Sequence, residues 1–229
     1  MTKTIAFVLY PGITVLDLVG PLQVLSAFAE FDPSYRVAVV AQGLSVLGTD
    51  TPLKVAPSHT FDQIPEPFAL IVPGGGPPAF AALGNEPLLD WVRRAARTAE
   101  VVGSVCTGSF ILGAAGLLEG RRATSHWGVR RLLAKFGATP VAERWVEDGP
   151  VLTAAGVSAG IDMALRLVER LAGEETARSV QLFIEYDPQP PLGPIDWAAA
   201  DLSSFEPHSK AMLETGLADQ PEMLARLMN

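Results

Sequence analysis

The 229-residue sequence contains only one cysteine, Cys106, and only three histidines. One cysteine cannot form an intrachain disulfide framework or a multi-cysteine zinc site, and a lone cysteine is compatible with a reducing compartment. The histidines, His59, His126 and His208, do not have the spacing of a ligand set. The sequence therefore predicts chemistry without a metal.

Clustered positive charge and long apolar runs are lacking as well. The net charge is −8 and no run of Lys or Arg occurs, which disfavours a nucleic-acid partner because phosphate contacts need grouped basic side chains. No segment reaches the roughly 18 to 20 apolar residues of a membrane span, and the N-terminal residues lack the pattern of a signal peptide. We expect a soluble, cytoplasmic protein with no nucleic-acid and no membrane partner.

Short apolar segments alternate with helical segments along the chain. Apolar residues make up 48% of the sequence and charged residues 18%, which is enough for a well-buried core. The expected strands are 4–10, 35–41, 68–72 and 101–105, and the expected helices are 16–28, 87–99, 108–115, 127–136, 161–171 and 174–186. This alternation predicts an α/β fold with a mostly parallel sheet covered on both faces. A hairpin that turns at 147–149 is expected at the edge of the sheet.

In such a fold, ligands bind beyond the carboxyl ends of the strands. Three candidate features follow expected strands in this way: Asp17, the glycine run 74–76, and Cys106. We therefore expect them to converge on one edge of the sheet.

Cys106 lies directly between an expected strand and a small-residue helix. A nucleophile on so sharp a turn needs small residues two positions before and after it, and Ser104 and Gly108 occupy these positions. The turn also places the thiol at a helix N-terminus, which predicts a lowered pKa. A lone cysteine is often an inert core residue instead, but this spacing favours a nucleophile.

The other candidate features each have a purely structural alternative. The amides of the run 74–76 would join the Thr107 amide as an oxyanion hole, or the run is only a flexible turn. Asp17 interrupts an apolar stretch, so it is either a paired functional carboxyl or a helix N-cap. His126 is either the partner base of the cysteine or a satisfied pocket or core histidine.

Four segments resemble a known family: SVCTGSFILGAAGLLEG, RRATSHW, LTAAGVSAGIDMAL and SVQLFIEYDPQPP. They resemble the ThiJ/PfpI superfamily, relatives of the class I glutamine amidotransferases, over about residues 3–191. The resemblance implies a flavodoxin-like three-layer sandwich and a homodimer. We divide the chain into a ThiJ/PfpI-like domain, 1–191, and a divergent C-terminal extension, 192–229, that packs on the same domain.

Two positions distinguish branches of this superfamily. Thr107 follows Cys106 where the intracellular proteases carry His, and the early acid is Asp17 where proteases, deglycases and chaperones use Glu. This combination resembles the isonitrile hydratases. It implies cofactor-independent hydration of an isonitrile, R–N≡C, to the N-substituted formamide.

The same resemblance implies roles for the site residues. Cys106 would attack the isonitrile carbon to form a thioimidate, and Asp17 would transfer the protons. Thr107 would orient Asp17 or the attacking water. The expected site further comprises the backbone donors Gly75 and Gly76 and, around a small apolar substrate, the pocket residues His126 and Trp127.

Other functions remain open for a chain of this kind. Cys106 would also serve a redox or ligand sensor that has no turnover, because an accessible low-pKa thiol is readily oxidised. A deglycase or peptidase-like activity is a further alternative within the superfamily. A transcription regulator would need an added basic helix-turn-helix domain of about 100 residues, which this acidic sequence does not favour.

Overall fold

A seven-stranded sheet with the order β10-β11-β7-β6-β1-β2-β5 forms the centre of the protein, whose computed structural model describes residues 2–228. The strands are β1 (Lys3–Val8), β2 (Tyr35–Ala41), β5 (His59–Thr60), β6 (Ala69–Val72), β7 (Val101–Val105), β10 (Trp145–Asp148) and β11 (Val151–Ala154). Every neighbouring pair is parallel except β10 and β11, which form the antiparallel hairpin at one edge. The predicted parallel sheet and edge hairpin are both confirmed.

Central strands of this sheet are buried along their whole length. All residues of β6, β7 and β11 are buried, and their sequences are short continuous apolar runs with few polar residues. Such runs are typical of parallel strands that helices cover on both faces. Two small ribbons lie outside the sheet, β3 (Leu47–Gly48) with β4 (Lys54–Val55), and β8 (Arg122–Ala123) with β9 (Thr139–Pro140).

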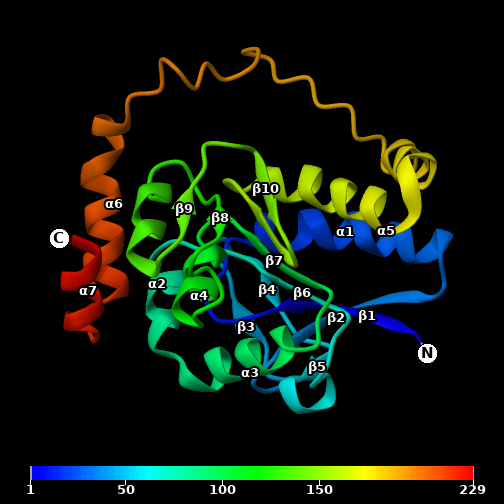
Figure 1. Cartoon of the computed structure of the whole chain (residues 1–229), viewed down its shortest axis with the longest axis horizontal. Helices are drawn as coiled ribbons and strands as arrows, with labels where there is room; N and C mark the ends of the chain where they lie inside the picture. Colours follow the sequence, from blue (N-terminus) through cyan, green and yellow to red (C-terminus); the bar gives the residue numbers. More distant parts are fainter. Residues whose placement is uncertain (1, 229) are drawn as a thin grey trace.

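Helices form a layer on each side of the sheet (Figure 1). The α-helices are α1 (Val15–Phe31), α2 (Pro77–Ala81), α3 (Glu86–Ala96), α4 (Gly108–Ala114), α5 (Ala159–Phe183), α6 (Leu202–Gly216) and α7 (Pro221–Met228). Helices α1 and α5 pack against each other on one face, whereas α2, α3 and α4 pack on the other. This is the expected flavodoxin-like three-layer arrangement.

The structure corrects two details of the helix prediction. Residues Arg130–Phe136 form a 3-10 helix rather than part of an α-helix, and Gly137 ends it in the left-handed conformation. Segments 161–171 and 174–186 are joined in α5, which breaks at Gly173 (φ 86°). Helix α1 continues past Pro21 to Phe31.

Small residues bring α1 and α5 close together near the start of each helix. A Cβ atom at Gly20 would lie 3.0 Å from Ile161 Cγ1, and one at Gly160 would lie 3.2 Å from Pro21 Cδ. A larger residue at either glycine would therefore require the neighbouring side chains to shift. This close approach matters because α1 carries Asp17, and α5 begins just after a loop that reaches Cys106.

The C-terminal residues return to the α/β core after a long connection. Segment 184–201 forms turns without a helix or strand and arches from the end of α5 to the start of α6 (Figure 1). Helix α6 then packs on α2 so closely that a Cβ at Gly216 would lie 2.3 Å from the Pro77 carbonyl oxygen. Arg226 Nε of α7 donates to the carbonyl of Lys135 (3.0 Å). Over the described residues, no helix has the length and apolar character needed to cross a membrane.

Candidate active site

Cys106 occupies a strained turn between β7 and α4. Its φ is +57°, a value that residues other than glycine rarely adopt. Gly108 makes the turn possible, because a Cβ there would lie 2.1 Å from the Val72 carbonyl oxygen. A strained residue on a sharp strand-to-helix turn is the geometry of a nucleophile elbow.

Hydrogen bonds hold the backbone of Cys106 in this conformation. Its amide donates to the Ala155 carbonyl (2.9 Å), and its carbonyl accepts from Ser109 Oγ (3.0 Å) and Ser125 Oγ (2.9 Å). The side chain is 5% exposed. The sulfur is therefore fixed in place and largely shielded from bulk water.

Asp17 lies in the first turn of α1 and is fully buried (0% exposed). Its Oδ2 accepts the amide of Gly74 across the loop (3.0 Å), and the residue that caps α1 is Thr14. The N-cap alternative for Asp17 is therefore wrong. Asp17 Oδ1 has no hydrogen bond of good geometry among the described residues, although the Cys106 thiol is near enough to lower the pKa of the carboxyl.

Burial dominates the ionisation of this pair. It raises the pKa of Asp17 to about 7, and the hydrogen bond from the Gly74 amide and the nearby Cys106 thiol oppose this rise only in part. Burial, followed by the charge of Asp17, also raises the pKa of Cys106 well above its ordinary value. The amides of Val157 and Thr107 lower the thiol pKa by less than burial raises it.

The expectation of a lowered thiol pKa is therefore wrong, because loss of hydration outweighs the helix N-terminus. Burial raises the pKa of both groups above their ordinary values. Since the two groups interact strongly, they titrate as one unit. The pair is suited to a reaction in which the thiol gives its proton to the carboxylate as it attacks.

The glycine turn and Thr107 support Asp17 from the opposite side. Thr107 Oγ1 donates to the Gly75 carbonyl (2.6 Å) and accepts the Gly75 amide (2.9 Å). A Cβ at Gly74 would lie 2.8 Å from Asp17 Oδ2 and 2.6 Å from the Thr107 nitrogen. The Thr107 hydroxyl thus supports Asp17 indirectly, because it holds the glycine turn that contacts the carboxyl. The Gly75 amide already donates to this hydroxyl, so it is not free to donate to a substrate. Gly76 caps α2 and borders open space.

His126 and Trp127 lie beside the elbow and are half-buried. His126 Nδ1 accepts the Gly128 amide (3.3 Å), and in residues 2–228 no hydrogen bond joins this ring to Cys106. Burial, and then the nearby His208, lower the pKa of His126, so the ring is neutral at pH 7. The structure therefore places His126 next to the site and leaves Asp17 as the titratable group that contacts the thiol.

Three residues near the pair were not identified from the sequence. The amide of Val157 faces the Cys106 sulfur, and its φ of +34° is unusual for a β-branched residue. Ser125 supports the Cys106 carbonyl, and Tyr10 donates its phenol hydrogen to the Pro73 carbonyl (2.9 Å). The only signal was that Ser125 and Val157 fall inside the family-like segments TSHW and GVSAG.

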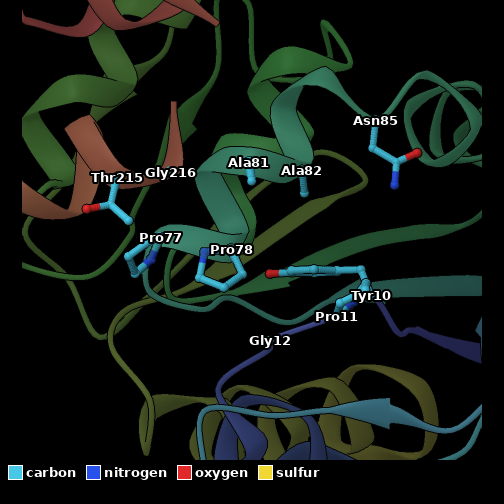
Figure 2. A pocket seen from close by; sticks show the side chains of 10 residues that line it. All are labelled: Tyr10, Pro11, Gly12, Pro77, Pro78, Ala81, Ala82, Asn85, Thr215 and Gly216. Atoms are coloured by element: carbon cyan, nitrogen blue, oxygen red, sulfur yellow. The ribbon is translucent and has the colours of Figure 1, made fainter. Parts of the chain in front are cut away.

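Tyr10 also lines a cavity of about 530 Å³ next to α2. Figure 2 shows its walls, which come from the β1–α1 loop, from α2 and its continuation, and from the end of α6. The lining residues are Tyr10, Pro11, Gly12, Pro77, Pro78, Ala81, Ala82, Asn85, Thr215 and Gly216. Cys106 does not line this cavity. Burial, together with Asp17 and Cys106, raises the pKa of Tyr10, which stays protonated.

The constellation supports nucleophilic addition accompanied by proton transfer. Among residues 2–228, no group of three or more His, Cys, Asp or Glu side chains is arranged to hold a metal ion. The pair instead offers a sulfur nucleophile and a carboxyl group with a pKa near neutrality, which is the range that serves both acid and base catalysis.

Known proteins resemble this chain over most of its length. The model of the DJ-1/PfpI family matches residues 3–170. The isonitrile hydratase of Pseudomonas putida is 44% identical over 195 residues, which are 84% of this chain and 82% of that protein. The HTH-type transcriptional regulator CdhR of Pseudomonas aeruginosa is 32% identical over 79% of this chain, which spans 54% of the regulator. A solved structure, a ThiJ/PfpI family protein from Pseudomonas syringae, superimposes with a TM-score of 0.85 at 35% identity and covers 99% of this chain and 90% of its own.

Proposed function

The chain belongs to the DJ-1/PfpI family, and we propose that it hydrates isonitriles to N-substituted formamides. The observation that carries the proposal is the fully buried Asp17 carboxyl beside the buried Cys106 thiol. Burial raises the pKa of this carboxyl to about 7. Such a pair can move one proton from sulfur to the substrate carbon without a metal or an organic cofactor. The named activity of the P. putida relative supports the same choice.

The first half of the reaction joins the substrate to the enzyme. Asp17 takes the thiol proton while the Cys106 sulfur bonds to the terminal carbon of R–N≡C. Protonated Asp17 then returns the proton to that carbon, which gives the thioimidate R–N=CH–S–Cys. The carboxyl group thus acts first as base and then as acid, and it ends the step ionised.

Water completes the reaction and frees the thiol. Asp17 accepts a proton from water as the oxygen adds to the thioimidate carbon, and it passes this proton to the substrate nitrogen, which returns Asp17 to its ionised form. The C–S bond of the tetrahedral adduct then breaks, the hydroxyl proton passes to sulfur, and R–NH–CHO leaves. Amides of Val157 and Thr107 face the sulfur and would stabilise it while it carries negative charge. Gly76 is the remaining candidate donor toward the substrate.

The ionisation of Cys106 argues against the sensor alternative. Thiols that sense oxidants are exposed and have a low pKa, whereas Cys106 is 5% exposed and its pKa is raised by burial. A thiol that ionises only while a neighbouring carboxylate accepts its proton is better suited to turnover. Because the proposed reaction needs a reduced thiol, we also propose that the protein works in a reducing compartment such as the cytoplasm.

A direct assay tests the proposed function. The purified protein is incubated with phenyl isonitrile, and N-phenylformamide is followed by nuclear magnetic resonance. We expect multiple turnovers without added metal or cofactor. Formamide production no faster than in buffer alone would refute the activity.

We further propose that two copies of the chain associate through an apolar surface near the start of α1. Five large apolar side chains there are 37–61% exposed: Leu16, Val19, Leu44, Val46 and Leu53. The ribbon of β3 and β4 that lies among them is held to α1 by the Asp50 carboxyl, which accepts the Val15 amide (3.0 Å). An exposed apolar group of this kind is typical of a protein–protein contact.

The oligomeric state tests this surface. Light scattering coupled to size exclusion should give a dimer for the natural chain and a shift toward monomer for Val46→Glu. Met228→Glu, at an exposed site on α7, serves as the matched control and should stay dimeric. A natural chain that is monomeric, or a Val46→Glu variant that is fully dimeric, would contradict the assignment.

A further inference from the structure

Five aromatic rings gather where the C-terminal extension returns to the α/β core. The segment after Ser125 contributes His126 and Trp127. The Phe205 ring of α6 lies 5.3 Å from His126 and 5.0 Å from Trp127. The extension adds two more rings, His208 at 4.9 Å from Phe205 and Trp197 at 6.3 Å from Trp127. We call these five residues the aromatic cluster.

The aromatic cluster begins next to the supports of the nucleophile. Ser125, the residue before His126, donates to the Cys106 carbonyl (2.9 Å). On the other side, a Cβ at Gly156 would lie 2.9 Å from His126 Cδ2, and the next residue, Val157, directs its amide at the Cys106 sulfur. His126 thus directly follows Ser125 in the chain, and its ring lies against Gly156, the residue before Val157. It therefore adjoins both segments that hold Cys106.

Contacts between helix α6 and residues 128–131 fix the position of Phe205 in the cluster. Phe205 lies directly over Gly128, where a Cβ would come within 2.2 Å of the ring carbons. Ser209 Oγ donates to the Gly128 carbonyl (3.2 Å), and Arg131 forms an ion pair with Glu206 (2.9 Å) on the neighbouring turn. The position of Phe205 thus depends on the absence of a side chain at residue 128.

The rings of the aromatic cluster are partly exposed to solvent. Its rings range from half-buried His126, Trp127 and Phe205 to exposed His208 and to Trp197, which is 57% exposed. His126 is neutral at pH 7 because burial lowers its pKa. Uncharged aromatic faces bind apolar groups, and they favour other rings through stacked or edge-to-face contacts.

We propose that the aromatic cluster binds the R group of the isonitrile and selects aryl over small alkyl substrates. This inference rests on the proposed function, since it concerns the substrate of the same site. The isonitrile carbon must reach Cys106, so its R group extends away from the sulfur toward the adjoining rings. The C-terminal extension would thereby determine specificity although it carries none of the reacting groups.

Steady-state kinetics with phenyl and methyl isonitrile test the selection. For Phe205→Ala we expect KM for phenyl isonitrile to rise about tenfold, which corresponds to about 1.4 kcal/mol of lost binding. The kinetics with methyl isonitrile should change less than about twofold, because its R group does not reach Phe205. Gly128→Ala should act in the same direction, since it displaces the Phe205 ring without removing it.

Phe31→Ala is the matched control, because Phe31 is also a partly exposed ring on a helix but pairs with Phe183 (5.8 Å) outside the cluster. This variant should leave the ratio of kcat/KM for phenyl isonitrile to kcat/KM for methyl isonitrile unchanged. Equal losses on both substrates in Phe205→Ala, with its circular dichroism intact, would overturn the inference.

Failure of the proposed function is a separate result, namely no turnover of either substrate by the natural chain. In that case, a titration with N-phenylformamide, monitored by tryptophan fluorescence, tests whether the aromatic cluster binds an aryl group. It should bind the natural chain about tenfold more tightly than Phe205→Ala. Equal affinities, or no binding to the natural chain, would overturn the inference.

Discussion

Replacing Cys106 with alanine is expected to lower kcat/KM for isonitrile hydration by at least about 10³-fold, because no other group in the site can form the covalent thioimidate. The substitution removes only one sulfur atom from a side chain that is 5% exposed. Kinetic assays with phenyl isonitrile measure the loss. Urea denaturation of the same sample should show that the fold is retained.

Cys106→Ser is the informative companion to this variant. A serine hydroxyl can occupy the same strained turn but is a far weaker nucleophile, so its activity should also fall below about one thousandth of the natural rate. Mass spectrometry of the natural enzyme, quenched during turnover, should detect the thioimidate. Near-normal hydration by either variant would mean that Cys106 is not the nucleophile.

Asp17→Asn should lower kcat/KM by about 10² to 10⁴-fold, the usual range for loss of a positioned acid–base group. Asparagine has nearly the same shape and can still accept the Gly74 amide that Asp17 binds at 3.0 Å. It cannot take the thiol proton or return it to carbon. An intact circular dichroism spectrum with unreduced activity would contradict the role of Asp17.

The pH dependence provides a second measurement on Asp17. The reactive pair carries one proton, and the pKa of Asp17 is about 7. As the pH falls below about 7, Asp17 takes up a second proton and can no longer accept that of the thiol. We therefore expect kcat/KM to fall on the acid side of about 7 and to level off above it. The residual kcat/KM of Asp17→Asn should not show this fall at acid pH.

The same carboxyl group should make folding less favourable at alkaline pH. The folded pKa, about 7, lies above the unfolded value of about 3.9. The stabilising contribution of this group is thus fully present below about pH 4 and is lost as the pH rises through 7. Three pKa units correspond to about 4 kcal/mol. We therefore expect the unfolding free energy of the natural chain to fall by about 4 kcal/mol relative to that of Asp17→Asn between pH 4 and 9. If the unfolding free energies of the two proteins change with pH in parallel, the pKa of Asp17 is not raised.

The sequence by itself determined the class of fold and the edge of the sheet on which the site lies. Short β-branched runs alternate with helical segments, and this local pattern predicts parallel strands whose carboxyl ends share one edge. Asp17, the glycine turn and Cys106 each follow such a strand, so their convergence needed no knowledge of packing. The small residues Ser104 and Gly108 likewise identified the elbow, because a sharp turn excludes larger side chains there.

Tertiary structure alone decided how those groups ionise and what surrounds them. The thiol pKa is raised rather than lowered, since burial depends on α1, α5 and the glycine turn closing around Cys106 together. Val157 joins the site through a positive φ that its residue type does not favour. The rings of His126 and Phe205 lie 5.3 Å apart although the two residues are far apart in the sequence. Contacts over such a distance depend on how whole helices pack, and no local sequence pattern encodes them.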